Sequence, residues 1–201
     1  MNAEAPIGKV IGKNAKVGYA FKWDGYYAPK VAYQLMNKGL KLKVASKPFS
    51  GLVDDAPVAF DYGTVVVHTG IQQMNDADLK SLVTKVAKEN GVDMYALQTG
   101  LTPSGIDLGS QSFSMLKKPQ VMIVGGRGAT SYDVGEVWHL FDQRYDIPLS
   151  VVDMTSLSYA DIDQYTTIVV VNGNYSGIQG NALNKLKSWV REGGVLIGVK
   201  G

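Results

Sequence analysis

Two kinds of segment alternate along this chain of 201 residues. The first kind is short and continuously apolar, such as "TVVVH" at 64–68 and "TIVVV" at 167–171. A continuous apolar run predicts a strand that is covered on both faces, as in a parallel sheet. The second kind predicts amphipathic helices, because its apolar residues recur at helical spacing. These residues are Leu79, Leu82, Val83 and Val86 in one segment, and Ala182, Leu186, Trp189 and Val190 in another.

Extending this pattern over the chain predicts the same order of elements twice: strand, helix, strand, strand, helix, strand. The predicted strands cover 16–21, 41–45, 64–68, 93–97, 120–124, 149–153, 167–171 and 195–199. The predicted helices cover 28–37, 76–89, 132–145 and 179–192. Strands that alternate with helices predict an α/β protein with doubly wound parallel sheets.

The two halves also resemble each other in sequence. A shift of 103 residues places "YGTVVVHTG" at 62–70 over "YTTIVVVNG" at 165–173, and "ENGV" at 89–92 over "EGGV" at 192–195. This predicts an internal duplication. The first α/β unit is then 12–100 and the second is 120–201. The pattern leaves open whether the two units form one sheet or two, and whether they pack as one domain. The segment 101–119 between them, which is rich in Pro, Ser and Gly, is predicted to be a linker.

Charge and composition narrow the classes of partner. Twenty Lys and Arg face 18 Asp and Glu, so the net charge of +2 gives no reason to expect nucleic acid as a partner. No apolar run approaches the roughly 20 residues that span a bilayer, so no membrane insertion is expected. The chain has no cysteine, which excludes disulfides, thiolate zinc sites and cysteine nucleophiles.

A glycine-rich stretch, "VMIVGGRGATSYD" at 121–133, follows a predicted strand and precedes a predicted helix. It has only the G-x-G part of a dinucleotide fingerprint and lacks the spacing of a phosphate loop. The favoured interpretation is a tight turn in which Thr130 caps the helix and Asp133 completes a capping box. Asp133 would also repel a phosphate. The alternative is that Arg127 meets a carboxylate or a sugar hydroxyl.

Ligands of open parallel sheets bind beyond the carboxyl ends of the strands. In the first unit these ends are 22–27 and 68–71, and in the second they are 125–131 and 172–177. Exposed aromatic residues there would stack on a sugar or peptide, or else pack across an interface. The candidate ligand-binding residues are Trp23, Asp24, Tyr26, His68, Arg127, Ser131, Asn172 and Asn174.

Catalytic motifs are absent from the sequence. The two histidines, His68 and His139, belong to no His-x-x-Glu or His-Glu-x-x-His motif, and no G-x-S-x-G elbow occurs. We therefore expect no catalytic residue, no metal site and no cofactor. A hydrolase built around Asp24 and His68 is the weakest alternative.

The order of elements and the end of the second half, "GGVLIGVKG", resemble the flavodoxin-like fold of class I glutamine amidotransferases. In that family a sharp turn after a strand carries the nucleophilic cysteine. Here "GVKG" places Lys200 at that position, and "ALQTG" places Gln98 there in the first half. The resemblance therefore implies the fold but not glutaminase chemistry.

A second resemblance runs through almost the whole chain. The strings "YAFKWDGYYAPK", "ALQTGLTPSGIDLGS" and "SYDVGEVWHLFDQRYDIPLSVVD" are similar to the region that follows the peptidase domain in bacterial zinc carboxypeptidase-like proteins. None of that family's metal motif occurs here, so no catalytic residue is carried over. The resemblance implies a non-catalytic accessory region that contacts the peptidase domain or its substrate.

The resemblance also sets the expected location. A fragment of an exported protein would be periplasmic or extracellular, and an independent protein without a signal peptide would be cytoplasmic. The resemblance alone implies that the parent polypeptide is an enzyme, a zinc metallocarboxypeptidase. The alternative function is a stand-alone module that binds a small ligand, either a sugar or a carboxylate.

Overall fold

The computed structural model describes residues 7–200 and divides the chain into two compact units, 1–118 and 119–201. Both units combine helices with sheets, so the predicted α/β class is confirmed. The linker predicted at 101–119 is wrong. Strands β8 (Ser104–Gly105) and β9 (Phe113–Met115) lie within this segment and pair with strands of the first unit, whose boundary falls after Lys118.

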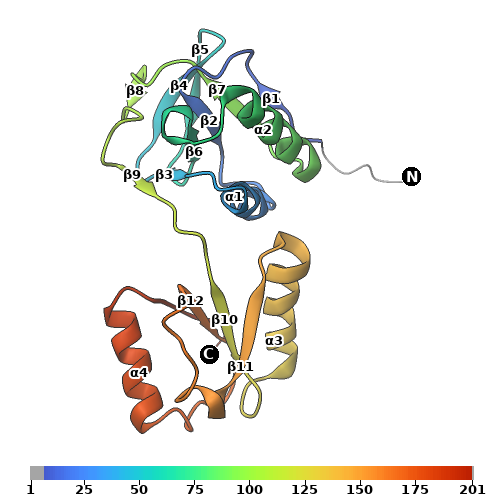
Figure 1. Ribbon diagram of the computed structural model, residues 1–201, viewed down its shortest axis with the longest axis vertical. Helices are drawn as coiled ribbons and strands as arrows, with labels where there is room; N and C mark the ends of the chain where they lie inside the picture. Colours follow the sequence, from blue (N-terminus) through green and yellow to red (C-terminus); the bar gives the residue numbers. More distant parts are fainter. Residues whose placement is uncertain (1–6, 201) are drawn as a thin grey trace, which may run out of the picture. The chain divides into compact units, whose positions relative to one another are not determined.

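The first unit is built on a six-stranded sheet with the order β1-β7-β2-β6-β3-β9 (Figure 1). Its strands are β1 (Val10–Ile11), β2 (Gly18–Phe21), β3 (Lys43–Ala45), β6 (Val65–His68), β7 (Met94–Leu97) and β9. Only β1 and β7 pair in parallel, and every other pair in this sheet is antiparallel. The parallel sheet predicted for the first half is therefore wrong, although its strands lie where they were predicted.

The central strands of this sheet are covered on both faces, which explains their continuous apolar sequence. Helices α1 (Ala28–Asn37) and α2 (Asp76–Asn90) cover one face, where they pack on side chains such as Phe21 and Val65. The other face is covered by a small antiparallel sheet of β5 (Ala56–Phe60), β4 (Phe49–Val53) and β8, which packs on Ala20 and Val66. A strand covered by a second sheet shows the same apolar pattern as one covered by helices, whatever its direction.

Helix α2 begins and ends at the signals that its sequence carries. The side chain of Asn75 accepts a hydrogen bond from the backbone N–H of Asp78 at 2.9 Å, which caps the first turn. At the other end Gly91 takes a left-handed conformation with φ 65°, the usual residue for that position. A short 3₁₀ turn, η1 (Thr69–Ile71), connects β6 to the segment before this helix.

The second unit is a four-stranded, fully parallel sheet with the order β11-β10-β12-β13. Its strands are β10 (Val121–Gly125), β11 (Leu149–Asp153), β12 (Thr167–Val170) and β13 (Val195–Gly198). Helix α4 (Gly180–Arg191) packs on one face of the sheet through Trp189. Helix α3 (Ser131–Trp138) lies on the opposite face, where Val134 approaches Gly125, and it continues as a π-helical segment, η2 (His139–Arg144). A 3₁₀ turn, η3 (Met154–Ser156), follows β11.

The sheets of the two units have different topologies. The strands that correspond in sequence have the order β3-β6-β2-β7 in the first unit and β11-β10-β12-β13 in the second. The first arrangement is antiparallel around β2, whereas the second is parallel throughout. The predicted duplication therefore does not extend to the arrangement of the strands.

Candidate functional site

A groove of about 700 Å³ opens in the first unit where β2 ends. It exists because β2 and β6 are antiparallel, with Phe21 opposite Val65, so the residues after β2 lie beside the residues before β6. Its lining comes from these two segments and from the small antiparallel sheet. The lining residues are Lys22, Trp23, Asp24, Pro48, Ala59, Phe60, Asp61, Tyr62, Gly63 and Thr64.

Two exposed aromatic side chains line this groove. Trp23 is 45% exposed and Tyr62 is 71% exposed, which is high for residues of this size. The Cβ of Trp23 lies 3.6 Å from the position that a Cβ on Gly63 would take, so Trp23 packs against a residue without a side chain. Gly63 also has φ 83°, a conformation that favours glycine. Gly63 therefore permits both the turn and the close approach of Trp23 to it.

The turn that carries Tyr62 is closed by hydrogen bonds. The Asp61 carbonyl accepts from the backbone N–H of Thr64 at 3.2 Å and from its hydroxyl at 2.7 Å. The Asp61 carboxylate accepts from the backbone N–H of Tyr62 at 2.8 Å. These contacts fix the backbone on which the Tyr62 side chain stands, so little loop ordering is needed when a ligand binds.

Three charged side chains line the groove. Asp24 and Asp61 are exposed, and within residues 7–200 neither takes part in an ion pair. Lys22 lies with its ammonium 5.8 Å from the centroid of the Tyr95 ring, within cation–π range. Burial raises the pKa of Tyr95, and the charges of Asp93 and Asp24 raise it further. Two carboxylates, Asp24 and Asp61, and one ammonium, Lys22, give the groove an excess of one negative charge.

The remaining candidates of the first unit lie outside this lining. Tyr26 is exposed, and its ring contacts the Tyr27 ring edge-on at the start of α1, at 4.9 Å between centroids. His68 pairs with Gly18 at the opposite end of β2, so its predicted proximity to the loop at 22–27 is wrong. The antiparallel pairing places the carboxyl ends of β2 and β6 at opposite edges of the sheet, which also separates Asp24 from His68.

His68 is packed rather than available to a ligand. Its ring contacts Phe113 edge-on at 5.9 Å, and its Nε2 atom is buried without a hydrogen-bond partner in the described chain. Burial lowers the pKa of His68 to about 4, and the charge of Lys43 contributes to the shift. The imidazole is therefore neutral at pH 7.

The candidates of the second unit lie around the carboxyl ends of β10 and β12, as the parallel pairing requires. Here the two loops hydrogen-bond directly to each other. The N–H of Asn174 donates to the carbonyl of Gly128 at 2.8 Å, and the N–H of Thr130 donates to the carbonyl of Asn172 at 2.9 Å. Ser131 is exposed at the first position of α3. The N–H groups of Thr130 and Asn174 are therefore engaged within the protein rather than directed at a phosphate.

A carboxylate also stands beside the glycine-rich turn. The N–H of Arg127 donates to Oδ2 of Asp153 at 3.4 Å, and Gly126 has no room for a Cβ because this carboxylate lies against it. Hydrogen bonds from the hydroxyl and the N–H of Thr155 lower the pKa of Asp153, so the group is negatively charged. A negative charge at this position opposes phosphate binding and favours the interpretation as a turn.

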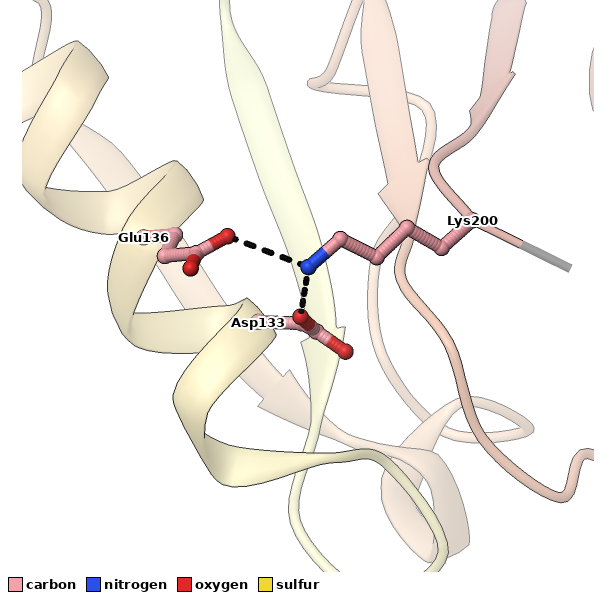
Figure 2. Close-up of polar contacts among 3 residues, drawn as sticks. All are labelled: Asp133, Glu136 and Lys200. Atoms are coloured by element: carbon pink, nitrogen blue, oxygen red, sulfur yellow. Dashed lines mark hydrogen bonds and ion pairs between the residues drawn. The ribbon is translucent and has the colours of Figure 1, made fainter.

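One ionic cluster in this unit has no counterpart among the predictions from the sequence (Figure 2). Lys200, just after β13, places its Nζ atom 2.6 Å from Oδ1 of Asp133 and 3.4 Å from Oε2 of Glu136. The Asp133 side chain is buried, so its charge needs this partner. The capping box predicted for Thr130 and Asp133 is wrong, because Thr130 makes no side-chain cap and the Asp133 carboxylate turns to Lys200.

Lys200 takes the left-handed conformation with φ 58°, which is uncommon for a residue with a side chain. It stands where the amidotransferase resemblance places the nucleophile. Hydrogen bonding to Asp133, and then to Glu136, raises the pKa of Lys200, so its amine is protonated. A protonated amine is not a nucleophile.

Residues 7–200 contain no group of three or more His, Asp or Glu side chains placed to hold a metal ion. No helix among them is long and apolar enough to cross a membrane.

Comparison with known proteins gives no relative. No protein-family model matches the chain, and neither a curated protein nor a solved structure matches it. The function must therefore be inferred from the site itself.

Proposed function

We propose that this chain is a non-catalytic binding module that holds a sugar ring in the groove between Trp23 and Tyr62. The observation that carries the proposal is a pair of exposed aromatic side chains that line one groove, Trp23 after β2 and Tyr62 on a turn closed by hydrogen bonds. An aromatic face stacks on the apolar face of a sugar ring. Asp24 and Asp61 are acceptors for the hydroxyl groups at its edge.

Binding is favoured over sugar hydrolysis by the surroundings of these carboxyl groups. A glycosidase needs one carboxylic acid that stays protonated, and a buried, apolar environment provides this. Asp24 and Asp61 are both exposed to solvent. A carboxylate ligand, the other small ligand that the sequence suggested, is disfavoured because two carboxylates would repel it.

We also propose that the module is the amidotransferase-like accessory region of an exported zinc carboxypeptidase-like protein. The long strings that resemble this region support the proposal, as does the second unit. There the strands have the order second, first, third, fourth, which is the order of flavodoxin-like sheets. In this proposal the module contacts the substrate or the adjacent peptidase domain. The presence or absence of a metallopeptidase domain upstream in the same gene tests it.

Substitution of Trp23 tests the sugar site. Trp23→Ala is expected to weaken binding of a sugar tetramer at least about tenfold, because the stacking surface is lost. Titration calorimetry with tetramers of glucose, N-acetylglucosamine and glucosamine measures the dissociation constants. Trp138→Ala is the matched control, since Trp138 is 41% exposed but belongs to the second unit. The proposal is wrong if no tetramer binds, or if both variants weaken binding equally.

A further inference from the structure

The charges of the groove say more about its ligand than that it is a sugar. We infer that the ring held by Trp23 and Tyr62 carries a free amino group, so that the ligand is a cationic amino sugar. This inference rests on the proposed function. It deepens that function by specifying the charge of the ligand.

The first argument is the balance of charge. The lining contributes two carboxylates, Asp24 and Asp61, against one ammonium, Lys22. The ammonium is placed over the Tyr95 ring, whereas neither carboxylate has an ion-pair partner in the described part of the chain. A positively charged group in the groove would provide the missing partner. A uronic acid would instead add a third negative charge.

The second argument is that the aromatic side chains favour the same charge. The face of an aromatic ring is the negative end of its quadrupole and attracts a cation within about 6 Å of its centre, most strongly at Trp. Trp23 and Tyr62 present such rings beside the two carboxylates. An N-acetylated ring would stack equally well but would gain neither electrostatic contribution. The groove should therefore distinguish an amine from an amide at the same ring position.

The expected size of this preference follows from the exposure of the groups. Each ion pair between exposed groups contributes weakly to the binding free energy, and salt screens it. Two such pairs therefore favour binding of the amine over the amide by a factor of about 5–10 at low ionic strength. At about 0.5 M salt the preference should fall to about twofold or less. Stacking on Trp23 is not screened, so overall sugar binding should persist at the higher salt concentration.

Calorimetry with two probes tests the inference on the full chain at about pH 6, where an amino group of this kind is protonated. The probes are the tetramer of glucosamine and the tetramer of N-acetylglucosamine. The glucosamine tetramer is expected to bind about 5–10 times more tightly. The double variant Asp24→Asn, Asp61→Asn should reduce this ratio to about one. Asp163→Asn, an exposed carboxylate of the second unit, should leave the ratio unchanged.

The outcomes separate the inference from the function on which it rests. If both tetramers bind equally and Trp23→Ala weakens both, the sugar site stands and the inference of an amino sugar is wrong. If the preference survives in the double Asp variant, the two carboxylates do not cause it, and the inference is again wrong. If only the glucose tetramer binds in a way that depends on Trp23, the sugar site stands and the inference of an amino sugar is wrong; if none of the three tetramers does, the proposed function itself is wrong. Circular dichroism of each variant confirms that it is folded.

Discussion

Replacing Gly128 by alanine is expected to destabilise the second unit by about 1–3 kcal/mol. Gly128 has φ 102°, a conformation that costs an L-residue free energy. A Cβ there would also lie 2.7 Å from the carbonyl oxygen of Asn174, a backbone atom that cannot move alone. The loops after β10 and β12 are hydrogen-bonded at this point, so the clash would force them apart. Urea unfolding, followed by tryptophan fluorescence, to which the buried Trp189 of this unit contributes, measures the loss.

Two substitutions nearby serve as controls. Gly135→Ala lies within α3 and meets no atom within 4 Å, so it should stabilise the protein by up to about 1 kcal/mol through helix propensity. Arg127→Ala removes an exposed side chain and should change stability by less than about 0.5 kcal/mol. If Gly128→Ala were neutral while phosphate raised the melting temperature in a manner dependent on Arg127, the interpretation of this loop as a turn would be wrong.

The second large effect is a loss of stability in acid that depends on His68. The folded state lowers the pKa of His68 from 6.5 to about 4, so between these values the unfolded chain binds more protons. Stability from this residue is therefore complete above about pH 6.5 and is lost as the pH falls to about 4. The free energy that corresponds to the full pKa shift is an upper limit, because the side chain is partly exposed and solvent screens its charge. The expected loss in the free energy of unfolding is roughly 2 kcal/mol. Urea unfolding at a series of pH values measures it.

The variant His68→Phe isolates this contribution. Its stability curve should lack the part of the acid loss between about pH 6.5 and 4, while other groups continue to contribute. At pH 7 it should be at least as stable as the parent, because the buried Nε2 atom without a partner is removed and the contact with Phe113 is kept. His139→Gln, an exposed histidine of the second unit, should leave the curve unchanged. Equal acid losses in His68→Phe and the parent would contradict the assignment.

Part of the groove could be predicted from the sequence. Trp23 and Asp24 are candidates from the sequence because they follow a buried strand, and both line the groove. Asp61 and Tyr62 were missed, although "DYG" before the next buried strand marks a turn with an exposed aromatic residue. The rule that ligands bind beyond the carboxyl ends of strands also predicts His68 beside Trp23. His68 lies at the opposite end of β2 because that rule assumes parallel strands, and β2 and β6 are antiparallel.

The small sheet that covers the first unit lies outside the elements that the apolar pattern predicts. Residues 49–53 alternate between buried and partly buried positions, as a half-covered strand does. The two residues that follow, Asp54 and Asp55, both have positive φ and form a two-residue hairpin turn between Val53 and Ala56. The prediction of a parallel sheet assumes helices on both faces, whereas this small sheet covers one of them.

The positions of the principal strands and helices in each unit could be predicted, because hydrophobic periodicity and capping are local properties of the chain. The direction and order of the strands in the first sheet depend instead on contacts between segments far apart in the chain. An apolar run indicates that both faces of a strand are covered, but it does not indicate which strands pair with it or in which direction. Strand direction in turn decided which side chains meet: Trp23 with Gly63 rather than with His68. The pair of Lys200 and Asp133 was decided in the same way, since 67 residues separate them and only the folded sheet brings their charges together.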